Sequence, residues 1–178
     1  PLTKAGLIAP DTALTAFSLT GYSGGGKKMI ADYELSPAGY DGGRQYALSQ
    51  SHKHLPEMVR ICGLDHAPVF SPVVVPHLSG MEVTVALHGV DPEAVRECYG
   101  DYYAGGKLVR FVRDISEEGF ISSSSYAGRD SMALAVYGNA ERAILVSVFD
   151  NLGKGASGSA IQNMNIVIGC DESEGLTL

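Results

Sequence analysis

The sequence contains no tryptophan and only three cysteines, Cys62, Cys98 and Cys170, with no Cys-x-x-Cys pair among them. An odd number of widely spaced cysteines argues against a disulfide framework and favours a reducing compartment, here the cytoplasm. None of the three lies at a glycine-rich helix start, where a thiolate would be stabilised. We therefore expect Cys62 and Cys98 to be buried and inert.

Positive charge is also scarce. Thirteen lysines and arginines stand against twenty acidic residues, which gives a net charge of −7, and no basic cluster is longer than Lys27-Lys28. This balance excludes a broad nucleic-acid-binding surface. No apolar run approaches the roughly 20 residues of a membrane helix, and the residues after Pro1 lack the pattern of a signal peptide. We expect neither a nucleic-acid partner nor a membrane partner.

The sequence does contain strand and helix patterns, without strict alternation. Apolar and polar residues alternate over 81–88, and β-branched residues fill 69–75, where Pro72 indicates an edge or a bulge. The other expected strands cover 13–20, 46–49, 108–112, 131–137 and 142–149. The expected helices cover the helix tail 2–7, 27–35, a segment from Pro56, 91–102 and 153–166, with a frayed tail over 171–178. This order predicts an α+β fold with a mixed or mostly antiparallel sheet and helices on one face.

The segment Gly21-Tyr22-Ser23-Gly24-Gly25-Gly26-Lys27 places a glycine-rich turn between a predicted strand and a predicted helix. It resembles a P-loop, but Lys28 stands where a P-loop has the Ser or Thr that binds Mg²⁺. Free amides at a helix start, together with Lys27, would form an anion cradle. The alternative is a tight turn with solvent-exposed lysines, and spacing alone favours neither.

His52 and His54 stand two residues apart, just before Pro56 and Glu57. Two histidines at this spacing in an extended segment face the same way, and Glu57 at the start of the next helix can orient an imidazole. A zinc site needs a third ligand at a clear spacing, and we see none, so we expect no metal. General acid–base chemistry suits a histidine at neutral pH. The alternative is a pair of surface or helix-capping histidines.

A second strand–turn–helix unit surrounds Asn151, with glycines at 153, 155 and 158. Asn151 can exchange hydrogen bonds with a ligand that carries an amide, and the alternative is a helix cap followed by a closely packed helix. The segment Pro76–Gly80 is expected to be a turn that holds His77 near a site. The serines 122–125 are expected to form a polar loop.

Taken together, these motifs resemble those of N-acetyl-gamma-glutamyl-phosphate reductase in its shorter bacterial form. Each motif is weak alone, but four occur in order: 21–27, 52–57, 76–80 and 150–158, followed by Ala160-Ile161-Gln162-Asn163-Met164-Asn165. The resemblance covers nearly all of the chain but only the C-terminal part of the family's length. The HxHxPE-like segment favours this family over the related aspartate-semialdehyde dehydrogenases.

The resemblance implies an NADPH-dependent reductase of arginine biosynthesis, which converts an acyl phosphate to a semialdehyde and phosphate. It also implies a fold like the C-terminal domain of glyceraldehyde-3-phosphate dehydrogenase and assembly as a homodimer or homotetramer. Residues 1–152 would form the substrate and oligomerisation domain, and 171–178 a tail. Residues 153–170 would form a helix that packs on an N-terminal dinucleotide-binding domain.

The resemblance also assigns roles to residues. His52 and His54 are the candidate acid–base pair, with His52 toward a nucleophilic sulfur, His54 toward the substrate, and Glu57 orienting one of them. Asn151 is the candidate nicotinamide contact. The phosphoryl group would be bound by residues of the glycine loop, which are Ser23, Gly24, Gly25 and Lys27.

The sequence departs from the family pattern in two places. The family's Gly-Cys-Tyr-Pro-Thr type motif, which holds the nucleophilic cysteine, is absent, and so is a GxGxxG cofactor segment. We therefore expect the chain to be a fragment that is inactive alone. The alternative is a non-catalytic module for dimerisation and anion binding, or a domain of a related semialdehyde dehydrogenase.

Overall fold

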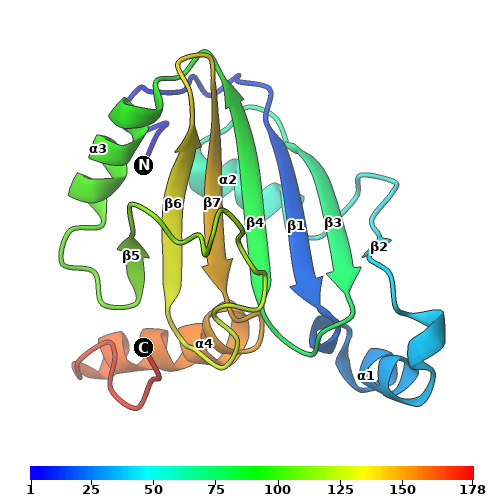
Figure 1. Cartoon of the computed structure of the whole chain (residues 1–178). Helices are drawn as coiled ribbons and strands as arrows, with labels where there is room; N and C mark the ends of the chain where they lie inside the picture. The colour runs from blue at the N-terminus through cyan, green and yellow to red at the C-terminus, as the bar shows by residue number, and fades with distance from the viewer.

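The computed structural model describes all 178 residues and contains a seven-stranded sheet with the order β2-β3-β1-β4-β7-β6-β5 (Figure 1). The strands are β1 (Thr15–Gly21), β2 (Arg44–Gln45), β3 (Val69–Val75), β4 (Met81–His88), β5 (Val109–Phe111), β6 (Met132–Gly138) and β7 (Arg142–Phe149). β1 pairs parallel with β3, and β5 pairs parallel with β6; the other neighbours are antiparallel. This mixed sheet confirms the α+β prediction.

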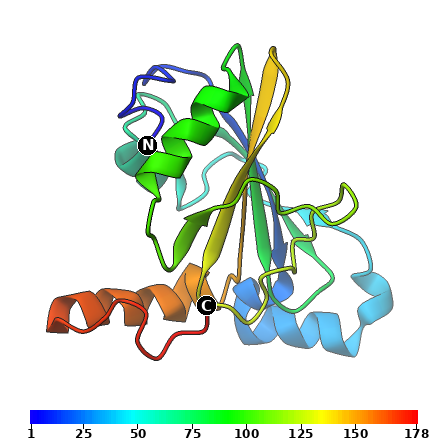
Figure 2. The same cartoon turned by 60° about the vertical axis from the view of Figure 1, so that its left-hand side comes forward.

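The helices lie on one face and at one end of the sheet. They are α1 (Gly26–Leu35), α2 (Leu55–Cys62), α3 (Pro92–Tyr102) and α4 (Gly158–Ile168), with short turns η1 (Tyr22–Gly25), η2 (Pro37–Gly39) and the π-helical η3 (Gly153–Ser157). α1 and α4 extend in opposite directions from the lower end of the sheet (Figure 1). Figure 2 shows α2, α3 and the N-terminal segment on one side of the sheet, and the connection 112–131 on the other.

The hydrophobic core lies between the sheet and the helices that cover it. The larger cluster joins α3 and the N-terminal segment to the central strands and consists of Leu2, Leu87, Val95, Tyr99, Val136 and Ala143. A smaller cluster of Ala16, Leu55 and Phe70 fixes α2 against β1 and β3. Burying one such aliphatic side chain contributes roughly 1.5–3 kcal/mol, so these contacts hold α2 in place.

The ends of two helices follow the capping chemistry that the sequence indicates. The Asp91 carboxylate accepts a hydrogen bond from the Glu93 amide at 3.0 Å, and Pro92 occupies the first helical position of α3. α2 ends at Gly63, which adopts the left-handed conformation with φ 66°. The predicted start of α3 at Asp91-Pro92 is confirmed.

The predicted strand over 46–49 is wrong. β2 covers only Arg44–Gln45, and Ala47 adopts a positive φ of 53° that no strand accommodates. The side-chain amide of Gln50 takes the place of a longer edge strand, because it exchanges hydrogen bonds with the backbone N–H and C=O of Phe70 at 2.9 and 2.8 Å. Pro72 lies in β3, which only the short β2 covers on its outer side.

Three smaller predictions also differ from the structure. Residues 2–7 form a hydrogen-bonded turn rather than a helix, closed by Leu7 N–H donating to the Leu2 carbonyl and Gly6 N–H to that of Thr3. The tail 171–178 is not frayed, since the Asp130 amide donates to the Thr177 carbonyl at 2.7 Å. Cys62 is exposed rather than buried, and Cys98 is half-buried.

Candidate functional site

A cavity of about 840 Å³ opens where the lower ends of β1, β3, β4 and β7 meet the glycine loop and the start of α2. Apolar strand residues form its floor, among them Phe70, Val74, Val83 and Phe149. Five of the eight residues singled out in the sequence line this one cavity: Gly24, Gly25, His52, His54 and Asn151. Segments separated by up to about 130 positions in the chain therefore share one surface.

The glycine loop is docked by its backbone onto the turn between β3 and β4. The amides of Gly21, Tyr22 and Ser23 donate to the carbonyls of Gly80, His77 and Leu78 at 2.9–3.0 Å. A Cβ on Gly21 would lie 2.6 Å from the Leu78 oxygen, so only glycine allows this approach. These three amides are therefore not free to bind an anion, although Gly21 lines the cavity together with Gly24 and Gly25.

Asn151 connects the glycine loop to the turn that precedes β4. Its Oδ1 accepts a hydrogen bond from the Gly80 amide at 2.9 Å, and its Nδ2 donates to Ser23 Oγ at 3.0 Å. Ser23 itself is buried and does not line the cavity. One hydrogen of the Asn151 amide and the hydroxyl hydrogen of Ser23 remain for other partners.

His52 and His54 lie together in the wall of the same cavity. Their ring centroids are 4.9 Å apart, and His52 also packs edge-on against Phe70 at 5.2 Å. The backbone N–H of His54 donates to Nδ1 of His52 at 3.3 Å. Nδ1 of His52 is therefore an acceptor, which places the proton of its neutral imidazole on Nε2.

The pKa of His52 lies below its usual value of 6.5. Partial burial disfavours the charged ring, and the neighbouring charges of His54 and Lys53 lower the pKa further. His52 is thus a neutral group with one N–H to donate at neutral pH. That state suits an acid–base role or a hydrogen bond to a thiolate.

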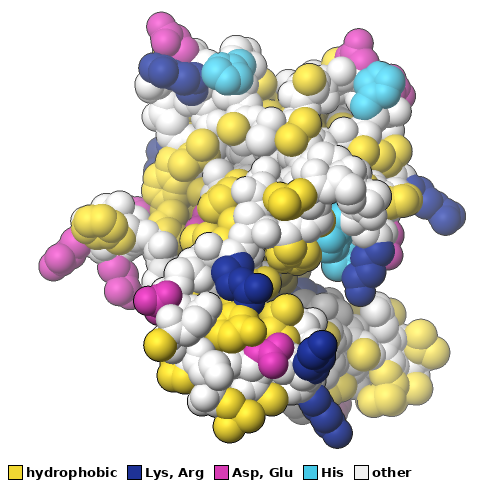
Figure 3. Space-filling model, turned by 90° about the vertical axis from the view of Figure 1, so that its right-hand side faces the viewer, with side chains coloured by type: hydrophobic (Ala, Val, Ile, Leu, Met, Phe, Trp, Pro, Cys, Tyr) yellow, Lys and Arg dark blue, Asp and Glu magenta, His cyan; other side chains and the backbone are white.

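The charged side chains that line the cavity are all basic. Arg44 and Lys53 line it together with the two histidines, and no aspartate or glutamate does. Figure 3 shows histidine and basic side chains gathered at a hollow on this side of the molecule. In a chain of net charge −7, such a lining concentrates anionic ligands. Sequence reasoning missed Arg44, Lys53 and the ring of Tyr46, because Arg44 lies in a strand of only two residues and the other two lie in irregular backbone.

Besides the buried Ser23, two residues singled out in the sequence do not line the cavity. Lys27 is exposed in the first turn of α1, and Glu57 is exposed in the first turn of α2. Glu57 forms no ion pair with His52 or His54. The orienting role of Glu57 and the phosphoryl contact of Lys27 remain predictions.

Asp150 is the buried charge that the sequence did not reveal. It is 2% exposed and accepts hydrogen bonds from the amides of Gly128, Leu152 and Gly153. Burial opposes ionisation, but these three amides outweigh it, and the pKa of Asp150 lies below its usual range. The carboxylate anchors the turn that carries Asn151 and is structural.

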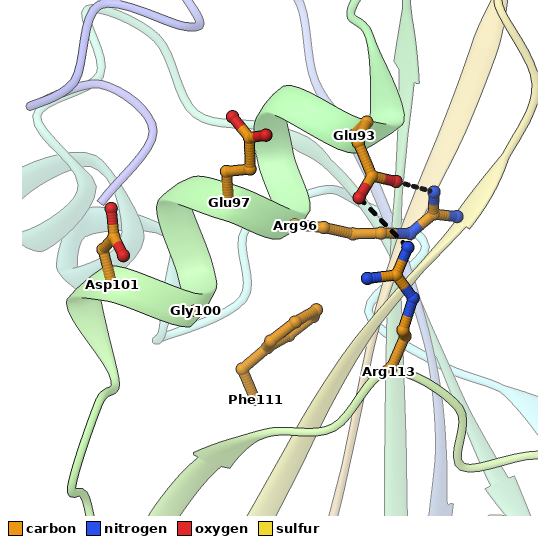
Figure 4. A pocket seen from close by; sticks show the side chains of 7 residues that line it. All are labelled: Glu93, Arg96, Glu97, Gly100, Asp101, Phe111 and Arg113. Atoms are coloured by element: carbon orange, nitrogen blue, oxygen red, sulfur yellow. Dashed lines mark hydrogen bonds and ion pairs between the residues drawn. The ribbon is translucent and has the colours of Figure 1, made fainter.

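A second cavity of about 480 Å³ lies between α3 and β5 (Figure 4). Glu93 stands between Arg96 and Arg113 and pairs with both, at 2.8 and 3.1 Å. Arg96 also donates to the Val136 carbonyl. The guanidinium groups of Arg96 and Arg113 are thus both paired with a carboxylate. The large cavity, in contrast, is lined by basic side chains that have no acidic partner in the lining.

No group of three or more histidine, cysteine, aspartate or glutamate side chains is arranged to hold a metal ion. None of the helices combines the length and the apolar character that crossing a bilayer requires.

Comparison with known sequences identifies relatives over almost the whole chain. The family model "Semialdehyde dehydrogenase, dimerisation domain" matches residues 1–151. An N-acetyl-gamma-glutamyl-phosphate reductase of Burkholderia ambifaria is 35% identical over 95% of this chain and 57% of its own length. That of Sinorhizobium medicae is 38% identical over 94% and 58%. The resemblance drawn from the sequence motifs is confirmed, and the chain spans somewhat over half the length of these relatives.

Comparison with solved structures shows the same fold. The aspartate semialdehyde dehydrogenase II of Vibrio cholerae superposes with a TM-score of 0.65 over 94% of this chain and 60% of its own, at 18% identity. The aspartate semialdehyde dehydrogenase of Francisella tularensis gives 0.65 at 13% identity, with the same coverage. At this identity the likeness establishes the architecture alone.

Proposed function

Because the chain belongs to the family of semialdehyde dehydrogenase dimerisation domains, we propose that it is the substrate-binding and dimerisation part of an NADPH-dependent reductase. The reaction is conversion of N-acetyl-γ-glutamyl phosphate to N-acetylglutamate semialdehyde and phosphate, in arginine biosynthesis. The observation that carries the proposal is the cavity whose charged lining is entirely basic. The names of the relatives favour this substrate over an aspartyl phosphate.

The charge of the cavity matches that of the substrate. N-acetyl-γ-glutamyl phosphate carries a carboxylate and a phosphoryl group, and both are acceptors for charge-assisted hydrogen bonds. Phosphoryl oxygens would approach the backbone of Gly24 and Gly25, beside the Met29 side chain that packs against Gly25. Ser23 would hold this part of the loop through its bond with Asn151, and Lys27 would reach the phosphoryl group from the next turn. The apolar floor with Phe70 and Phe149 would contact the methylene chain of the substrate.

In the proposed reaction the two histidines have separate roles in hydrogen bonding and proton transfer. A thiolate attacks the acyl carbon, the bond from that carbon to the phosphoryl oxygen breaks, and phosphate leaves. His52, neutral with its proton on Nε2, donates a hydrogen bond to the sulfur. His54 contacts the substrate and exchanges a proton with the acyl oxygen. After hydride has added to the acyl carbon, that oxygen gives up its proton as the C–S bond breaks, which releases the aldehyde and the thiolate. Neither Cys62, Cys98 nor Cys170 lines the cavity, so the sulfur comes from elsewhere in the proposed enzyme.

NADPH supplies the hydride that reduces the acyl group. Of the residues in this chain, we expect Asn151 to contact the nicotinamide. Its amide fits this role in part, since one N–H remains after the bonds to Gly80 and Ser23. In this proposal the nucleophilic cysteine and the other cofactor contacts belong to a dinucleotide-binding domain, in the part of the relatives that this chain does not cover.

Two apolar surfaces support the proposed assembly. Residues 153–170 would form the helical segment that packs on the dinucleotide-binding domain, and α4 exposes Met164, Ile166, Val167 and Ile168. The second surface is the sheet face opposite α2, defined by Phe17, Val69 and Ile144, which are 40%, 56% and 41% exposed. We propose that a second copy of the chain covers this open sheet face, in keeping with the family description.

The test is a chimaera in which the N-terminal part of the Burkholderia ambifaria relative precedes this chain. We expect phosphate-releasing, NADPH-dependent turnover of N-acetyl-γ-glutamyl phosphate by the chimaera and none by the chain alone. His52→Ala should lower kcat by about a hundredfold or more, as loss of an acid–base group does. Lys27→Ala should raise KM about tenfold, as loss of one charge-assisted bond does.

Arg142→Gln is the matched control, because Arg142 starts β7 at the end remote from Phe149 and the cavity. Its kinetics should equal those of the parent chimaera. Unchanged kinetics of the His52→Ala and Lys27→Ala variants would remove both assignments. A folded chimaera that binds NADPH but turns over no acyl phosphate contradicts the proposed function.

A further inference from the structure

Three tyrosines and one arginine form a continuous stack that begins in the glycine loop. The rings of Tyr22 and Tyr33 stack with centroids 4.6 Å apart and an interplanar angle of 14°. Tyr33 contacts Tyr40 at 4.7 Å, and the guanidinium of Arg44 lies over the Tyr40 ring at 4.6 Å. The stack, named here the tyrosine column, sets the position of Arg44 relative to the loop.

Arg44 is a charge without a partner in the protein. It forms no ion pair, and among the four arginines without one, Arg44, Arg60, Arg110 and Arg129, only Arg44 lines the large cavity. Its side chain lines the large cavity, and so does Tyr33. Tyr33 is 5% exposed, and its buried hydroxyl has no hydrogen-bond partner. Because that hydroxyl is closed to the cavity and Arg44 is exposed at it, the Arg44 guanidinium is the unpaired group of the column that a ligand can reach.

We propose that Arg44 is a specificity-determining residue that binds a carboxylate of the ligand. It makes the cavity select molecules with two anionic groups, one at Arg44 and one toward the histidines and the glycine loop. The inference rests on the proposed function for the identity of the second anion. A guanidinium presents N–H groups in a planar fork that matches a carboxylate, and stacking on Tyr40 fixes that plane before the ligand arrives.

The experiment titrates glutarate and its monoamide, glutaramate, into the 178-residue chain and follows the imidazole resonances of His52 and His54 by NMR. The two ligands have the same length and differ in one carboxylate. We expect the wild-type chain to bind glutarate about tenfold more tightly than glutaramate. Arg44→Gln should weaken glutarate binding about tenfold and abolish the preference, and Arg44→Lys should retain part of it, because charge survives without the fork.

Two further variants separate binding from folding. Tyr40→Leu keeps the arginine but removes its stacking partner, and we expect a smaller loss of affinity than for Arg44→Gln. Arg142→Gln removes a remote surface charge and should leave both affinities unchanged. Glutarate binding by Arg44→Gln within about twofold of the wild type, or no saturable response of the wild type to glutarate, overturns the proposal. The reductase assay is independent of this result, so the two proposals can fail separately.

Discussion

At the scale of single residues, the geometry of His52 separates a working acid–base group from a surface histidine. Its Nδ1 is engaged by the His54 amide at 3.3 Å, its ring contacts Phe70, and its pKa is lowered by partial burial and two neighbouring charges. The pKa of an exposed histidine with no such neighbours would lie near the usual value of about 6.5. His52 and the unpaired Arg44 together give the cavity one neutral donor and one fixed charge.

We predict that the C–H resonances of His52 titrate in the folded chain with a midpoint below 6.5. Lys53→Gln should move that midpoint upward, because one positive neighbour is removed, and Arg142→Gln should not move it. The measurement is an NMR pH titration of the three proteins. A His52 midpoint at or above 6.5, or no shift on Lys53→Gln, would show that the ring is not placed as described.

The same shift predicts the direction of a stability effect. The pKa of His52 is lower in the folded than in the unfolded chain, so the unfolded chain binds more protons between the two values. The contribution of His52 to the free energy of unfolding is fully present above about pH 6.5, the pKa in the unfolded chain. It is lost as the pH falls from that value through the lower pKa of the folded chain. His52→Gln should therefore lose less stability than the wild type over that range.

At the scale of elements, the glycine loop is positioned by its neighbours more than by its own sequence. The turn 77–80 accepts three of its amide hydrogen bonds, and Asn151 ties Gly80 to Ser23. His77 extends the same support, since its Nε2 bonds with Ser123 Oγ at 2.8 Å on the connection 112–131. The loop, the turn and this connection therefore form one hydrogen-bonded unit.

Gly21→Ala tests this unit, because the new Cβ would lie 2.6 Å from the Leu78 carbonyl oxygen while the φ of −59° suits alanine. We predict a loss of about 1–3 kcal/mol in the free energy of unfolding, the usual cost of overpacking. Gly42→Ala, which meets no atom within 4 Å, should be neutral or slightly stabilising. Urea unfolding of both variants checks this, and equal stabilities would refute the docking.

Sequence reasoning located the regular elements because their signals are local. β4 and β7 have the predicted bounds, owing to alternating and β-branched residues, and α3 begins where Asp91 and Pro92 specify. The segment around β2 carries no such signal. There, the side chain of Gln50 bonds with the backbone of β3 in place of a longer strand, and Ala47 adopts a positive φ. The sequence therefore predicted neither the fold of this segment nor the position of Arg44 in the cavity.

The candidate site was predictable in part for the same reason. Motifs at Gly24, His52 and Asn151 are recognisable in the sequence, and the cavity contains all three. Helix-start residues such as Lys27 and Glu57 were placed correctly along the chain, but which way a first-turn side chain points depends on tertiary packing. The three occupied loop amides depend on a turn more than 50 residues away, which no local pattern reveals.

At the scale of the whole molecule, the sheet has one covered and one open face. Strand pairing places Val69, Ala86 and Ile144 in one row across β3, β4 and β7, with Phe17 in the next row on β1. The connection 112–131 lies on this side only over part of the sheet (Figure 2), where Tyr137 bonds with Asp114. An exposed apolar face of this kind marks an interaction surface.

We predict that the chain is a dimer in solution and that Phe17→Asp shifts it toward the monomer by at least about tenfold in dissociation constant. An isologous interface doubles the effect, because each copy contributes the same buried charge. Light scattering after size exclusion measures it, with Leu35→Asp on exposed α1 as the control. A wild-type monomer at high concentration, or an unchanged dimer for Phe17→Asp, contradicts the assignment of this face.

The central claim is that the basic cavity serves N-acetyl-γ-glutamyl phosphate rather than an aspartyl phosphate, whose free ammonium group finds no acidic partner in the lining. The most direct measurement is the ratio of kcat/KM for N-acetyl-γ-glutamyl phosphate to that for β-aspartyl phosphate, in the chimaera described above. The account predicts a ratio of at least about a hundred, since a site built around specific polar partners discriminates at this level. A ratio near one, or a preference for β-aspartyl phosphate, would contradict it.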